Sequence, residues 1–78
     1  MTTSDDALLE RITVDPEKCG GRPCLGETRI RVVDVLNMLG GGMTEAEILG
    51  DYPQLTEQDV RAALVFAAQQ FDHPVLSA

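Results

Sequence analysis

The chain has 78 residues, is 44% hydrophobic and carries a formal net charge of −7, which fits one globular domain with a modest core and excludes a disordered segment. No apolar run reaches the length of a membrane span, and the acidic residues 1–6 lack the layout of a signal peptide. We therefore expect a cytoplasmic protein whose cysteines are reduced thiols.

The composition predicts one domain between two short ends. Residues 1–10 are interpreted as a flexible N-terminal tail, residues 11–72 as the domain and residues 73–78 as a C-terminal tail.

Two strands are predicted before the helices. Residues 11–14 are rich in β-branched side chains, and residues 18–26 form a glycine-rich loop. Residues 28–32 then alternate, with Arg29 and Arg31 on one face and apolar or small side chains on the other. The second strand is expected to pair with the first and form a short ribbon.

Three helices follow the ribbon. Apolar residues at helical spacing predict the first over residues 32–39, ended by the glycines at 40–42. The second is predicted over residues 45–51 and is stopped by Pro53. The third begins at Glu57 and ends at residues 72–74, with an apolar stripe of Val60, Leu64, Ala67, Ala68 and Phe71, widened by Val65 and Phe66.

The last two helices begin with near-copies of one capping signal. Thr44 and Glu47 match a capping box, as do Thr56 and Asp59 twelve residues later. Apolar residues on either side suit hydrophobic staples, Met43 with Ile48 and Leu55 with Val60. The predicted fold class is mainly α with a short N-terminal β-ribbon, a tri-helical helix-turn-helix domain.

No set of residues suited to catalysis or to metal binding is evident. Cys19, Cys24 and His73 fall one ligand short of a structural zinc site within one chain and have unfavourable spacing. The glycine-rich segments match no nucleotide-binding fingerprint. We therefore expect a protein that is not an enzyme and has no cofactor or metal.

The arginines are the candidate binding residues. Residues 1–31 carry a net charge of −1 and residues 32–78 a net charge of −6, so the cations gather in the first part of the chain. Arg29 and Arg31 can contact nucleic acid or pair with the carboxylates of a partner, unless they only form a solvated face. Arg22 and Arg61 complete the candidate partner- or DNA-binding set.

The chain resembles a bacterial family known as domain of unknown function 433. The resemblance covers residues 12–68, and its motifs are ITVDPE at 12–17, CGGRP at 19–23, TRI at 28–30, GMT at 42–44, YPQLT at 52–56 and DVRAAL at 59–64. One difference is Glu27, where the family usually has glycine, and we expect a less sharp turn there.

The resemblance implies a homeodomain-like tri-helical fold and an antitoxin role in a type II toxin–antitoxin pair, beside a PIN-like ribonuclease toxin. A DNA-binding regulator of its own operator and a purely structural dimerisation module are the alternatives. The acids at the start of the third helix oppose contact with phosphate, so DNA binding would depend on the ribbon arginines. We expect a homodimer, because the ribbon and the short chain leave apolar surface to cover.

Overall fold

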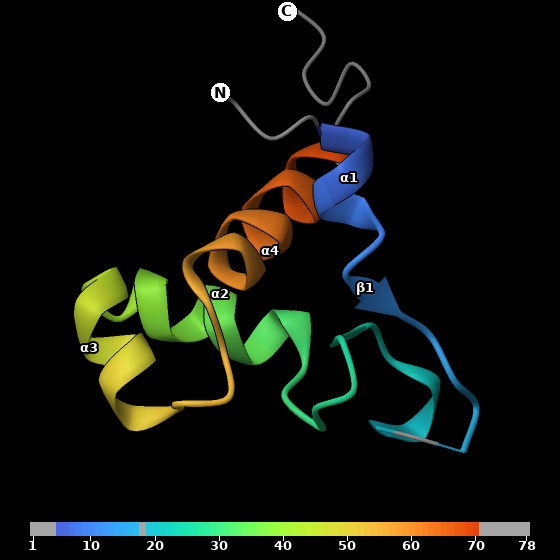
Figure 1. The fold of residues 1–78 in the computed structure, drawn as a ribbon, viewed down its shortest axis with the longest axis horizontal. Coiled ribbons are helices and arrows are strands. Elements are labelled where there is room, and N and C mark those ends of the chain that lie inside the picture. Colours follow the sequence, from blue (N-terminus) through green and yellow to red (C-terminus); the bar gives the residue numbers. More distant parts are fainter. Residues whose placement is uncertain (1–4, 18, 71–78) are drawn as a thin grey trace, which may run out of the picture.

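The computed structural model describes residues 5–17 and 19–70. In chain order its elements are α1 (Asp5–Leu9), β1 (Ile12–Thr13), the 3-10 turn η1 (Cys19–Gly21), β2 (Cys24–Leu25), α2 (Val32–Gly40), α3 (Glu45–Asp51) and α4 (Glu57–Gln70) (Figure 1). The two strands are antiparallel, with Ile12 opposite Leu25. The predicted fold class, mainly α with a short β-ribbon and a tri-helical core, is confirmed.

The three main helices begin where the sequence predicts, because their caps are local. The Glu47 carboxylate accepts the Thr44 amide at 2.8 Å, and the Thr44 hydroxyl accepts the Glu47 amide at 3.1 Å. The hydrogen bond from the Thr44 amide to the Glu47 carboxylate lowers the pKa of Glu47. At the end of α2, Gly42 has a φ of 100°, and the Met43 amide donates to the Met38 carbonyl, as in a Schellman motif.

The prediction of a second strand over residues 28–32 is wrong. The partner of β1 is β2, inside the segment expected to be a loop, and residues 26–29 form turns and bends. We expected a less sharp turn at Glu27, where the family usually has glycine. The neighbouring Gly26, with a φ of 58°, forms the turn here. Arg31 forms one isolated bridge with Cys24, and the Val32 amide donates to the Pro23 carbonyl at 3.0 Å. The alternation of residues 28–32 therefore reflects a turn leading into α2.

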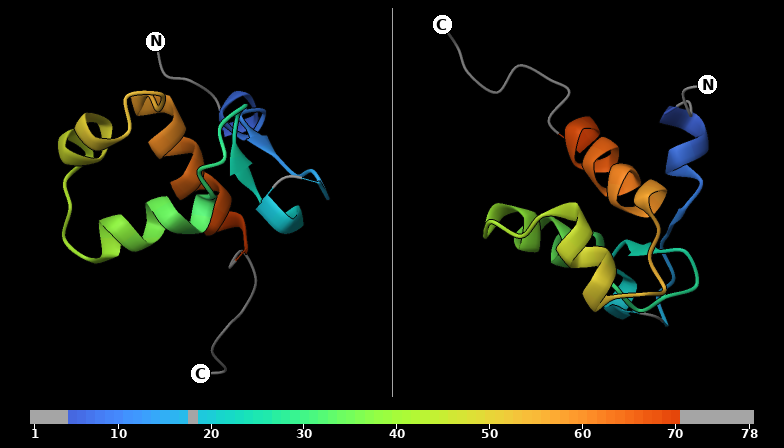
Figure 2. Two further views of the ribbon diagram at one scale, coloured as in Figure 1. Left: turned by 90° about the horizontal axis from the view of Figure 1, so that it is seen from below. Right: turned by 60° about the vertical axis from the view of Figure 1, so that its left-hand side comes forward.

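Part of the predicted N-terminal tail is structured. Residues 5–9 form α1, which packs beside α4 in both views (Figures 1 and 2). Leu8 supplies the contact and is only 2% exposed. The expectation of a loose tail over residues 1–10 underestimated this one apolar anchor; residues 1–4 and 71–78 lie outside the described range.

The core is aliphatic, as the composition predicts, but α4 presents a different face to it. Leu64 is 48% exposed and Ala68 is exposed, which contradicts the predicted stripe. The small residues Ala62 and Ala63 are fully buried instead, so α4 approaches its neighbours closely. The buried apolar cluster consists of Leu8, Leu25, Ile30, Val32, Val35, Ile48, Leu55, Val60, Ala62 and Ala63.

A buried carboxylate joins the ribbon to the start of α4. Asp59, 7% exposed, accepts the Thr56 amide at 2.9 Å, which completes the second capping box with the Thr56 hydroxyl. Its other oxygen accepts Arg11 Nη1 at 3.1 Å. Arg11 also donates to the side-chain oxygen of Gln58. One acid therefore caps a helix and holds the segment that enters β1.

We expect Asp59→Ala to lower the free energy of unfolding by about 2 kcal/mol, because it removes a cap and leaves Arg11 and the Thr56 amide without their acceptor. Urea unfolding followed by circular dichroism measures this change. Glu57→Ala, an exposed acid in the same helical turn, is the matched control and should cost about 0.5 kcal/mol or less. Equal losses in the two variants would contradict the role given to Asp59.

Candidate protein-binding surface

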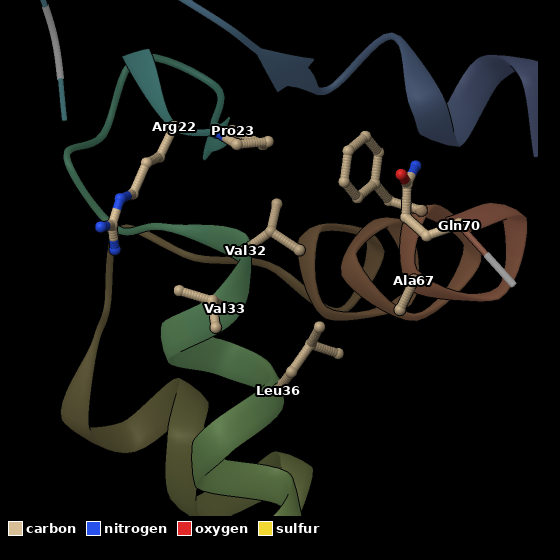
Figure 3. Close-up of a pocket in the computed structure, with 8 residues that line it drawn as sticks. Arg22, Pro23, Val32, Val33, Leu36, Ala67 and Gln70 are labelled. Atoms are coloured by element: carbon tan, nitrogen blue, oxygen red, sulfur yellow. The ribbon is translucent and has the colours of Figure 1, made fainter. Parts of the chain in front are cut away.

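An apolar groove lies where the start of α2 faces the last turns of α4. Its volume is about 380 Å³, and it is lined by Arg22, Pro23, Val32, Val33, Leu36, Phe66, Ala67 and Gln70. In Figure 3 the α2 residues form one wall, Ala67 and Gln70 belong to the other, and the loop with Arg22 and Pro23 lies at one end. Val33 is 42% exposed, so an apolar side chain stands open to solvent at the groove.

The polar groups of the groove are at its ends. Arg22 and Gln70 are both exposed and lie on opposite sides in Figure 3, with aliphatic side chains between them. Within the described part of the chain, no buried side-chain polar atom lacks a hydrogen-bond partner. The groove therefore offers apolar contact along its length and a cation at one end.

Arg31 is tied into its own helix. Its Nη2 and Nε donate to the two oxygens of Asp34 at 2.9 and 3.1 Å, and Asp34 also accepts the Arg31 amide at 3.3 Å. The Arg31 hydrogen bonds lower the pKa of Asp34 against an opposing effect of burial, and the nearby charge of Arg22 lowers it further. The same pairing raises the pKa of Arg31. Arg31 thus serves first to start α2.

Arg29 lies near this ion pair. It lines a second hollow of about 460 Å³ together with Ile30, Asp34, Asn37, Met38 and Tyr52. Arg29 is exposed and also takes part in an interaction within the chain. Both hollows and the Arg31–Asp34 pair include residues of α2, and we call the residues of both hollows and of the pair together the α2 surface.

The structure brings together three of the four predicted binding arginines. Arg22, Arg29 and Arg31 all belong to the α2 surface. Arg61 does not, because it is on the exposed side of α4, and helical geometry places it away from Phe66 and Ala67. The grouping arises from the turn before α2 and not from the face of a strand.

The apolar part of the α2 surface was not predicted as a site. The stripe of the first helix explains Val32, Val35 and Leu36, but Val33 falls outside it. The apolar Val33, which lies outside the buried stripe, was the feature of the sequence that could have indicated this site. Phe66 was assigned to the edge of a buried stripe, whereas it is half-buried beside the groove.

The cysteine prediction needs correction. Cys24 is buried and disulfide-bonded, so the expected reduced thiol is not found at this position; the side chain of Cys19 lies outside the description. In the ranges 5–17 and 19–70, no group of three acidic, cysteine or histidine residues is placed to hold a metal ion. His73 is outside those ranges. None of the helices in them is long and apolar enough to cross a membrane.

The Arg31–Asp34 pair predicts a pH dependence. Because the folded pKa of Asp34 is lowered, its stabilising effect is present at neutral pH and is lost as the pH falls below the ordinary carboxyl range of about 4. Asp34→Asn should therefore lose less stability than the wild type between pH 6 and pH 3, measured by urea unfolding at each pH. Arg31→Gln should reduce the same difference. A variant with the full wild-type pH dependence would contradict this role.

The comparisons agree with this architecture. No curated protein matches the chain. A crystal structure of a DUF433 member protein from Anabaena variabilis ATCC 29413 is similar, with a TM-score of 0.75 and 33% sequence identity. The match covers 82% of this chain and 63% of that protein, so the chain spans less than two thirds of its length. The family model described as protein of unknown function (DUF433) matches residues 12–67. With its ribbon, its three capped helices and this match, the chain belongs to the DUF433 family.

Proposed function

We propose that this chain is an antitoxin-like binding protein that neutralises a PIN-like ribonuclease by direct contact in the cytoplasm, and that it is not an enzyme. The partner class is what the resemblance to the DUF433 family implies. The observation that carries the binding role is the apolar groove of the α2 surface, which has the exposed Val33 in its lining and Arg22 at one end.

The charge of the molecule supports two kinds of contact with such a nuclease. PIN-type nucleases hold metal with clustered carboxylates beside a basic RNA cleft. Arg22 and Arg29 suit the carboxylates, while the acidic starts of α3 and α4 suit basic groups. The disulfide bond of Cys24 is unusual for a cytoplasmic protein.

The DNA-binding alternative has less support. It relied on Arg29 and Arg31 as the face of a ribbon, but Arg31 pairs with Asp34 and residues 28–32 are not a strand. The first turn of α4, which would enter the groove of DNA, exposes the carboxylate of Glu57. Carboxylates at that position repel phosphate.

Replacing Val33 tests the binding surface. Val33→Glu places a charge at the groove and should weaken neutralisation of a PIN-like ribonuclease partner by about tenfold or more, measured as residual RNA cleavage at fixed nuclease concentration. Val14→Glu is the matched control, because Val14 is 63% exposed and does not line the groove. Equal neutralisation by both variants would remove the α2 surface from the proposal.

We also propose that the chain forms a homodimer. Leu64 is a large apolar side chain that remains exposed outside the α2 surface, and a second copy can cover it. Light scattering of the purified chain should give about twice the mass of 8.4 kDa at micromolar concentration. A monomer mass would contradict this assignment.

A further inference from the structure

We infer that the groove between α2 and α4 binds an amphipathic helix with an apolar face and a carboxylate at one end, next to Arg22. The inference rests on the proposed function for the source of the helix, which is the partner protein. It goes beyond that proposal in assigning the shape and charge of the segment that is bound.

The form of the groove favours a helix as its occupant. Its two long walls come from the helices α2 and α4, and a third helix can pack its side-chain ridges between them. An extended strand needs the free edge of a sheet for its backbone hydrogen bonds. The strands β1 and β2 have two residues each, and neither contributes to the lining.

The lining excludes a small polar ligand. Six of the eight lining residues are apolar, and the other two, Arg22 and Gln70, are exposed at the ends. Specific sites for small polar molecules place several converging polar groups inside the pocket. This groove places none between its ends, so its contacts along most of its length are with apolar side chains.

The charge at one end selects a carboxylate. Within the described residues, the Arg22 guanidinium forms no hydrogen bond or ion pair, and Asp34 is near enough only to interact through its charge. Both oxygens of Asp34 already accept hydrogen bonds from Arg31. The donors of Arg22 therefore remain available, and a carboxylate is the group that their planar arrangement binds in a bidentate manner.

A second copy of this chain suits the groove less well. In a two-fold contact each surface meets its own counterpart, so the arginines of the two α2 surfaces would face one another. Like charges at an interface oppose association. An anionic segment of a different protein avoids this repulsion.

The test uses the full chain and two synthetic helical peptides. Both carry leucines at positions i, i+3, i+4 and i+7; one has glutamates on its remaining face and the other has lysines in their place. Chemical-shift mapping of the labelled chain locates the bound peptide, and titration gives its affinity even when binding is only millimolar. We expect shifts at Val33, Leu36 and Ala67, with none at Val14.

The charge comparison separates specific from general attraction. A chain of net charge −7 attracts lysine peptides over long range. A contact with Arg22 should instead make the glutamate peptide bind about tenfold more tightly. Arg22→Glu should abolish this preference, and Arg61→Glu, the same change away from the groove, should retain it.

Each of the following results would overturn the inference: no shifts with either peptide at millimolar concentration, shifts confined to other surfaces, or tighter binding of the lysine peptide in the wild-type chain. Persistence of the glutamate preference in Arg22→Glu would do so as well. These results are independent of nuclease neutralisation, so a failure of the proposed function and a failure of the groove assignment can be told apart.

Discussion

The Asp59 carboxylate is the contact on which the arrangement of the domain depends. It is almost fully buried, and a buried carboxylate is costly unless its oxygens are hydrogen-bonded. The backbone of Thr56 and the guanidinium of Arg11 satisfy them. Since these partners are far apart in the chain, the charge can be buried only when the ribbon and α4 are both in place. The interaction links local helix capping to the tertiary fold.

A second ion pair has the same form but another consequence. Arg31 stands at the N-terminus of α2, where a positive charge opposes the helix dipole. Asp34 offsets this with its hydrogen bonds and its negative charge in the first turn. Pairing engages Arg31 at its own helix, while Arg22 lines one hollow and Arg29 lines the other. Arg31 therefore has a structural role at the start of α2.

The helices could be predicted from the sequence because their signals are local. Threonine caps, a glycine stop and Pro53 define α2, α3 and the start of α4 with little help from tertiary contacts. The ribbon could not be predicted as well, since two residues per strand give too short a pattern, and an alternation of Arg and Ile or Val also fits a turn. Similarly, α1 depends on burial of Leu8 against α4, a contact that no local pattern reports.

The candidate site was predicted only in part, for a related reason. Charge patterning identified the arginines, but it did not show that the turn before α2 brings Arg22 and Arg29 near Asp34. The groove depends on which side of α4 faces α2. Leu64 and Phe66 are both large apolar residues, and the sequence pattern does not show that Phe66 lines the groove while Leu64 is exposed.

The hydrogen bond from the Val32 amide to the Pro23 carbonyl fastens the end of the groove to its α2 wall. The Arg31–Cys24 bridge lies directly beside it. These contacts fix the spacing between the loop with Pro23 and the start of α2 in the free chain. Little conformational entropy would therefore be lost in that loop on association. In the proposed complex, the ordering would fall mainly on the bound segment.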